Sequence, residues 1–138
     1  MSEVARTAYD MISGMTPELR PGIFVFVTTD DPNLIASLSS KAISIFKEDE
    51  GTSMIVTADL AETFMLNVEQ PMRCITLNVF SSLEGVGLTS AVSGALGDSA
   101  IPCNMVAAFH HDHVFVPSEM CDRAMEILLS LQSCATQA

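Results

Sequence analysis

The sequence predicts an α+β fold made of two consecutive β-α-β-β-α units, with antiparallel-rich sheets and helices packed on one face. Two observations predict this fold. Segments with alternating apolar residues, typical of strands, are interleaved with segments whose apolar residues recur at helical spacing. The same order of segments occurs twice, in full in the second half and in shortened form in the first half. At 138 residues, the chain can bury one core or two small lobes.

The second half shows the pattern most clearly. Residues 73–80 alternate and have one strongly apolar face, which predicts a strand. Ser81 and Ser82 can cap a following helix, whose apolar positions recur over residues 88–96. Gly97 suits the end of that helix, where the φ angle is often positive.

Two more strands and a second helix complete this unit. Alternation predicts strands at residues 101–109 and 114–116, which flank a polar break at residues 110–113. A helix then opens at residues 117–118, and its apolar stripe continues as far as Leu131. The order is therefore β-α-β-β-α.

The first half contains a shortened version with three strands, at residues 22–28, 42–46 and 53–56. The first of these strands is almost continuously apolar, which predicts burial on both of its faces. A turn at residues 31–33 precedes one or two helical turns, and Thr57 caps another short helix. Acidic residues 48–50 followed by Gly51 indicate a hairpin between the second and third strands. Two such units correspond to the ferredoxin-like arrangement.

These patterns divide the chain into three parts. Residues 1–20 are expected to form an N-terminal helical extension that leans on the sheet, and residues 21–70 the first, shortened unit. Residues 71–138 form the second unit. The junction falls at residues 67–72, which contain Pro71.

The charge of the chain argues against two classes of partner. Seventeen acidic residues against 6 basic ones give a net charge of −11. Nucleic acid and anionic membranes require clustered Lys and Arg, which six scattered cations do not provide. No apolar stretch reaches the roughly 18 residues of a membrane span, and charged residues interrupt any signal-peptide core. We therefore expect a cytoplasmic protein that binds neither nucleic acid nor membrane.

The 4 cysteines lack the CxxC spacing of metal and redox motifs; they are Cys74, Cys103, Cys121 and Cys134. In a chain without a secretion signal, we expect free thiols that pack as small hydrophobic side chains.

Four motifs in the second half carry a resemblance to a known family; they are RCITL at residues 73–77, SSLEGVGLT at 81–89, IPCN at 101–104 and HDHVFVP at 111–117. With these motifs the chain resembles a bacterial family of tandem ACT-domain proteins whose function was long unknown. That family is similar to the ACT regions of the animal cytosolic arginine sensor. Most of the resemblance covers residues 73–131, and the first half matches more loosely, through residues 21–26 and 50–51.

The resemblance implies a ligand site. ACT domains are β-α-β-β-α-β units that bind amino acids or similar small ligands, usually between paired units and near the loop from the first strand to the first helix. In this chain that loop spans residues 81–88. The ligand-binding residues implied by the resemblance are Ser82, Leu83, Gly85, Val86, Gly87, Leu88 and Asn104.

The physical chemistry of this loop is compatible with an anionic ligand group. Gly85 and Gly87 would leave backbone N–H groups accessible, and the N-terminal end of the following helix attracts a carboxylate. Ser82 could add a hydroxyl donor. Asn104, off the apolar face of the next strand, could bond an amino or carboxylate group. Without the resemblance, the same loop residues favour an ordinary capped connection between strand and helix.

A second polar constellation, made of His110, His111, Asp112 and His113, could begin a zinc or copper site. Strand alternation, however, directs His110 away from His111 and His113, and a single short loop would supply all the ligands. A polar hairpin tip is the favoured interpretation. We therefore expect no metal and no cofactor.

The functional prediction is a non-enzymatic, ligand-sensing regulatory protein. A nucleophile such as Cys103 or Ser82 with His111 as its base is conceivable, but nothing places them together and no GxSxG elbow occurs. The alternative is a structural or protein-interaction module without a small ligand. Open strand edges in small units favour self-association, so we also predict a homodimer.

Overall fold

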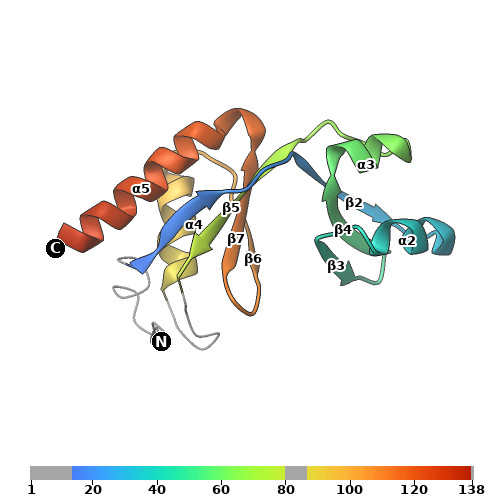
Figure 1. Cartoon of the computed structure of the whole chain (residues 1–138), viewed down its shortest axis with the longest axis horizontal. Coiled ribbons are helices and arrows are strands. Elements are labelled where there is room, and N and C mark those ends of the chain that lie inside the picture. Colours follow the sequence, from blue (N-terminus) through green and yellow to red (C-terminus); the bar gives the residue numbers. More distant parts are fainter. Residues whose placement is uncertain (1–13, 80–86, 138) are drawn as a thin grey trace. The chain divides into compact units, whose positions relative to one another are not determined.

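The computed structural model describes residues 14–79 and 87–137 of the chain. These residues form two compact units (Figure 1). The first unit spans Gly22–Met72, and the second combines the described residues up to Pro21 with those from Arg73 onward. Residues 22–72 are thus inserted between two segments of the second unit.

The first unit contains three full strands and two short helices; they are β2 (Phe24–Thr29), α2 (Pro32–Ser39), β3 (Ser44–Lys47), β4 (Thr52–Thr57) and α3 (Ala58–Thr63). The strands lie in the order β3-β4-β2 with antiparallel pairing. Met72 pairs with Phe24 on the free side of β2, where a fourth strand belongs in a ferredoxin-like sheet. Each helix begins at a polar cap. Asp31 Oδ1 accepts a hydrogen bond from the Asn33 amide at 2.9 Å, and Thr57 Oγ1 accepts one from the Leu60 amide at 3.3 Å.

One face of this small sheet is covered by the helices, and its buried core is formed by Val25, Leu38, Met54, Val56 and Ala61. The prediction that residues 22–28 are buried on both faces is only partly correct. Val25 faces the core, but the next side chain, Phe26, points to the opposite face and is 47% exposed. On that second face Phe24 is buried, so the face is covered at the start of β2 and open at Phe26.

The second unit contains four strands and two longer helices; they are β1 (Thr16–Leu19), β5 (Met72–Asn78), α4 (Leu88–Asp98), β6 (Asn104–Ala107), β7 (Asp112–Pro117), the 3₁₀ turn Ser118–Met120 and α5 (Cys121–Gln137). The strands follow the order β1-β5-β7-β6. β1 pairs antiparallel with β5, and β6 pairs antiparallel with β7. The α+β prediction with two β-α-β-β-α units is confirmed (Figure 1).

The core of the second unit is formed by alternate residues of β5 and β7 and by the inner faces of α4 and α5; its buried members are Met15, Ile75, Leu77, Val79, Leu88, Val92, Leu96, Ile101, Val114, Val116, Cys121, Ala124 and Leu128. The helical spacing of Leu88, Val92 and Leu96 explains why one face of α4 is buried.

The expected N-terminal helical extension over residues 1–20 requires a correction. Its described part is helical only at Gly14 and then forms the strand β1 at Thr16–Leu19, which is the fourth strand of the second unit. Pro17 disfavours a helix interior but is compatible with a strand at a sheet edge. Residues 1–13 of the expected extension lie outside the described residues.

Three element boundaries in the second unit also differ from the prediction. α4 continues through Gly97 to Asp98, and the positive φ angle of 58° belongs to Ala100. The strand expected at residues 101–109 is limited to Asn104–Ala107. β7 begins two residues earlier than expected, because Asp112 and His113 pair with Ala107 and Val106 of β6. Within the described residues, no helix is long and apolar enough to cross a membrane.

Candidate ligand-binding site

The structure describes three of the seven predicted ligand-binding residues, which are Gly87, Leu88 and Asn104. The others, Ser82, Leu83, Gly85 and Val86, lie outside the described residues. All three described residues belong to the second unit.

Gly87 is the N-cap residue of α4 and directly precedes its first helical residue, Leu88. Its φ of 106° and ψ of −25° lie where side chains are strongly disfavoured, which explains the glycine. Its carbonyl accepts the Ala91 amide at 2.9 Å, and no side-chain hydrogen bond caps this helix end in the described part of the chain. The first amides of a helix carry a partial positive charge and suit an anion. Leu88 is buried in the core, so only its backbone is available to a ligand.

Asn104 begins β6 and lies on the face of the sheet that the helices leave uncovered. It stands opposite Phe115, which alternates with the core residues Val114 and Val116. The Nδ2 group of Asn104 donates a hydrogen bond to the Phe115 carbonyl at 3.3 Å. This bond fixes the orientation of the half-buried carboxamide.

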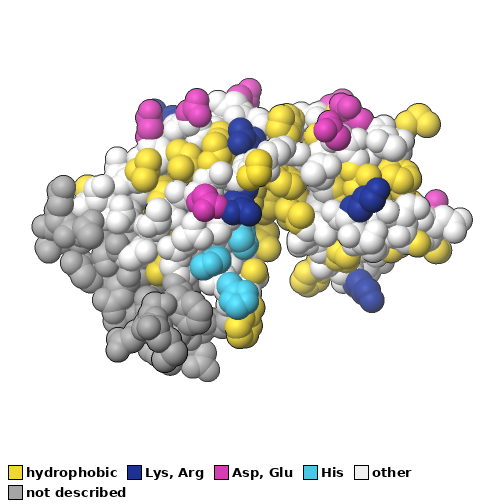
Figure 2. Space-filling view, in the orientation of Figure 1, with side chains coloured by type: hydrophobic (Ala, Val, Ile, Leu, Met, Phe, Trp, Pro, Cys, Tyr) yellow, Lys and Arg dark blue, Asp and Glu magenta, His cyan; other side chains and the backbone are white. Residues whose placement is uncertain are grey.

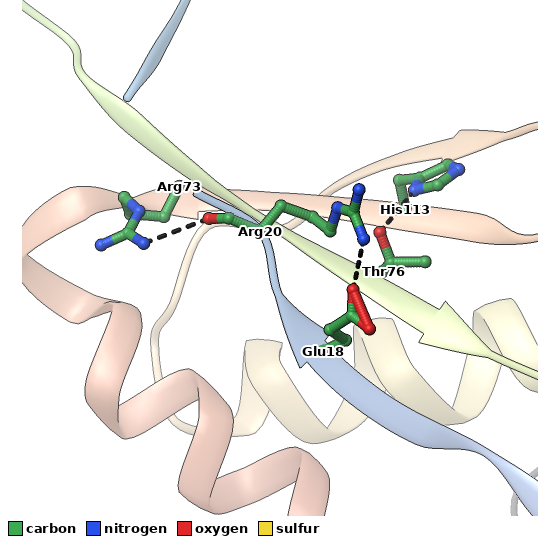
Figure 3. Close-up of polar contacts among 5 residues, drawn as sticks. All are labelled: Glu18, Arg20, Arg73, Thr76 and His113. Atoms are coloured by element: carbon green, nitrogen blue, oxygen red, sulfur yellow. Dashed lines mark hydrogen bonds and ion pairs between the residues drawn. The ribbon is translucent and has the colours of Figure 1, made fainter. Parts of the chain in front are cut away.

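The same uncovered face carries a polar cluster on β1, β5 and β7, formed by Glu18, Arg20, Thr76 and His113 (Figure 3). Glu18 lies opposite Thr76 in the β1–β5 register, and Glu18 and Arg20 form an ion pair. Thr76 Oγ1 and His113 Nδ1 are hydrogen-bonded at 3.0 Å. Figure 2 shows the histidine side chains grouped on the surface of this unit. The cluster offers a cation, a carboxylate and an imidazole on one sheet face.

Arg73 ties the two segments of the second unit together. Its Nη2 donates to the Arg20 carbonyl at 3.1 Å, and the Arg20 amide donates to the Cys74 carbonyl at 2.8 Å (Figure 3). Among the described residues, Arg73 Nε is a buried polar atom without a hydrogen-bond partner. The guanidinium therefore holds the end of β1 against the start of β5.

The histidine-rich stretch does not converge on one point. His113 bonds Thr76, whereas His111 Nδ1 lies 3.4 Å from the Val79 carbonyl and donates to it. The His110 ring instead packs edge-on against Phe109. Within residues 14–79 and 87–137, no group of three or more His, Cys, Asp and Glu side chains could hold a metal ion.

Burial lowers the pKa of His113 below its ordinary value of 6.5; His111 and Arg20 lower it further, whereas Asp112 raises it. The unfolded chain therefore takes up this proton first as the pH falls through 6.5, so His113 makes folding less favourable in acid. Burial raises the pKa of the Asp112 carboxyl. The folded chain therefore takes up this proton before the unfolded chain does, so Asp112 makes folding more favourable as the pH falls.

As the pH falls from about 7.5 to about 5.5, we expect the melting temperature of the His113→Gln variant to decrease less than that of the native protein. Glutamine keeps a hydrogen-bonding group near Thr76 but does not titrate. Calorimetric melting temperatures measure the difference, and His110→Gln, at an exposed position, is the matched control. If the melting temperatures of the native protein and the His113→Gln variant depended on pH to the same extent, the lowered pKa of His113 would be contradicted.

The cysteines are free, as expected, but only part of the packing prediction is correct. Cys74 and Cys121 are buried and Cys103 is half-buried, whereas Cys134 is exposed near the end of α5. Burial raises the pKa of the thiols of Cys74, Cys103 and Cys121. These three side chains therefore remain protonated and are poor nucleophiles near neutral pH.

Sequence reasoning missed Glu18 and Arg20 as members of a polar sheet face, because residues 1–20 were expected to be helical. The available signal was the alternation of buried and exposed residues in β1, where Pro17 is buried between the exposed Thr16 and Glu18.

The chain belongs to the ACT-domain family and contains two ACT domains in tandem. One ACT-domain profile matches residues 9–73 and another matches residues 69–130. ACT domains are regulatory, so the chain has a regulatory, ligand-sensing role in general. The predicted resemblance to tandem ACT-domain proteins is confirmed.

Solved structures show the same fold. A Vibrio cholerae protein of unknown function, described as a possible transport protein, is 32% identical with a TM-score of 0.79, over 90% of this chain and 94% of that one. The regulatory subunit of Thermus thermophilus aspartate kinase is 11% identical with a TM-score of 0.58, over 86% of this chain and 98% of that one. Clostridium acetobutylicum aspartate kinase is 10% identical with a TM-score of 0.63, over 94% of this chain but only 36% of the kinase. No curated protein matches the sequence.

Proposed function

We propose that this chain is a non-enzymatic regulatory protein that binds an amino acid or a similar small metabolite in its second ACT domain, at the start of α4. The observation that carries the proposal is the glycine-led start of this helix, where Gly87 has a φ of 106° and no side-chain hydrogen bond caps the described helix end. Amides left without a capping side chain suit a ligand carboxylate.

The mechanism of such a protein is a shift of equilibrium. A ligand that binds one state of the chain more tightly than another favours that state by its difference in binding free energy. The affected equilibrium would be the pairing of this chain with a second copy, since ACT domains often dimerise. No catalytic step is needed for this role.

The chemistry of the second domain supports binding rather than catalysis. The imidazole of His113 is hydrogen-bonded to Thr76, whose side chain is buried in the sheet. Burial keeps the thiols of Cys74, Cys103 and Cys121 protonated. Their arrangement offers no activated nucleophile.

A thermal-shift screen against the twenty amino acids and common nucleotides tests the proposal. A ligand that binds only the folded state adds about 2.7 kcal/mol at one hundred times its dissociation constant. We expect one amino acid to raise the melting temperature in a saturable manner. A flat screen, with a control protein responding to its own ligand, would contradict ligand sensing and favour the interaction module.

Gly87→Ala is the variant that addresses the site. The added Cβ disfavours the positive φ that Gly87 needs, so we expect the affinity for the amino acid to fall at least about tenfold. Gly94→Ala is a matched control on the same helix, because a Cβ at Gly94 meets no atom within 4 Å. An equal loss of affinity in both variants would argue against a site at the start of α4.

The proposed homodimer would form through β3 of the first domain. β3 is the edge strand of this sheet in the described part of the chain and pairs with β4. Ile45 is 44% and Phe46 is 71% exposed on it, and Figure 2 shows apolar side chains at the surface of this domain. An exposed apolar edge is a template for pairing with another strand.

The charges beside β3 support a second copy of the chain as the partner. Lys41 precedes the strand and the acidic residues 48–50 follow it. Antiparallel pairing of two β3 strands about a two-fold axis would bring Lys41 of each copy near the acidic turn of the other.

A further inference from the structure

A cavity of about 230 Å³ lies beside β2 within the first ACT domain, and its lining residues are Val25, Phe26, Asn67, Glu69, Gln70 and Met72. Sequence reasoning treated residues 67–72 only as a junction between units. Every lining residue belongs to the Gly22–Met72 unit, so the cavity is separate from the start of α4.

The cavity exists because the sheet ladder beside β2 is short. β2 pairs with β4 over all 6 of its residues, but its pairing with β5 is limited to Phe24 and Met72. Before Met72, the chain follows a turn in which Asn67 Oδ1 accepts the Glu69 amide at 2.7 Å. A hollow is therefore left beside Val25 and Phe26, where a longer fourth strand would have lain.

The lining combines a negative charge with an aromatic side chain. Glu69 supplies a carboxylate, Asn67 and Gln70 supply carboxamides, and the Phe26 side chain is 47% exposed. No lysine, arginine or histidine lines the cavity within the part of the chain that the structure describes. A carboxylate ligand would meet the charge of Glu69 without any compensating cation, whereas an ammonium group could bind both Glu69 and the face of the Phe26 ring.

The size of the cavity limits the ligand. Its volume of about 230 Å³ suits a small ligand. This is below the roughly 300 Å³ at which pockets for drug-sized molecules begin. The net charge of −11 favours the approach of cations from a distance.

We propose that this cavity binds a small organic cation, an amine or a quaternary ammonium ion, with its charge between Glu69 and Phe26. A zwitterionic amino acid is a poorer ligand here, because its carboxylate has no cationic partner in the lining. The first domain would thus respond to a ligand of different charge from the one proposed for the second domain.

A titration of the ¹⁵N-labelled full chain, followed by amide NMR shifts, tests the proposal. The probes are n-butylamine and tetramethylammonium, with n-butanol and butyrate as neutral and anionic counterparts at constant ionic strength. We expect both cations to shift the amides of residues 67–70 and 72 saturably, and the counterparts to bind at least about tenfold more weakly. Equal binding of butanol or butyrate, or cation shifts confined to other residues, would overturn the proposal.

Glu69→Gln should weaken butylammonium binding at least fivefold while leaving the other amide resonances in place, because Glu69 is exposed and its loss should not unfold the domain. Glu62→Gln is the matched control, an exposed acid on α3 of the same domain, and should change the affinity less than twofold. Equal affinities in the two variants would overturn the assignment to Glu69. Since butylamine has no carboxylate, this experiment is independent of amino-acid binding at α4.

Discussion

Replacing Met15 by alanine is expected to lower the free energy of unfolding by about 2–5 kcal/mol, the range for deleting a fully buried methionine side chain. Met15 is 0% exposed in the core of the second compact unit, although residues 22–72 separate it in sequence from the rest of that unit. The change leaves a cavity beside β5 and weakens the attachment of β1.

Urea unfolding measures this effect, and Met65→Ala is the matched control. Met65 is 93% exposed, so the same substitution there should change the stability by less than about 0.5 kcal/mol. Similar small losses in both variants would mean that the segment before β1 does not pack into the second compact unit.

Placing lysine at both Ile45 and Phe46 is expected to separate the proposed dimer. Each of these apolar side chains contributes roughly 1.5–3 kcal/mol when it is fully buried, and two-fold pairing would also place the new charges near one another. Together these effects should weaken dimerisation by at least about a hundredfold. Charged edge strands are a common means by which proteins avoid such pairing.

Analytical ultracentrifugation over a range of concentrations measures this change. The native chain should sediment as a dimer and the double variant as a monomer, whereas Met65→Lys, at an exposed position outside β3, should leave the dimer intact. A native chain that stays monomeric at every concentration would refute the homodimer.

The sequence was most informative where a periodic pattern of apolar residues extends over a whole helix or strand. The apolar positions of α4 and α5 and the alternation in β5 determine which faces are buried, so these elements were predicted in the correct order. β1 was not predicted, because a strand of only 4 residues depends on its partner β5, which lies more than fifty residues further along the chain. The start of β7 was misplaced for a similar reason, since pairing with β6 includes polar residues that carry no apolar signal.

The residues of the candidate sites divide in the same way, into those that follow from local sequence patterns and those that depend on the pairing of distant strands. The position of Asn104 off the core face follows from a local pattern and was anticipated, whereas the positive φ that requires glycine at residue 87 was not. The contact between Thr76 and His113 depends on the register of strands 37 residues apart in sequence. The cavity beside β2 depends on where a ladder ends, which residues 67–72 alone do not reveal.

The central claim is that an amino acid binds at the start of α4 in the second ACT domain. Titration of the ¹⁵N-labelled chain with the amino acids, followed by amide NMR shifts, tests it most directly. We expect one amino acid to shift the amides of Gly87, Leu88 and Asn104 saturably, with the shifts much reduced in Gly87→Ala. If no amino acid shifts these amides, or if the shifts persist unchanged in Gly87→Ala, the claim is contradicted.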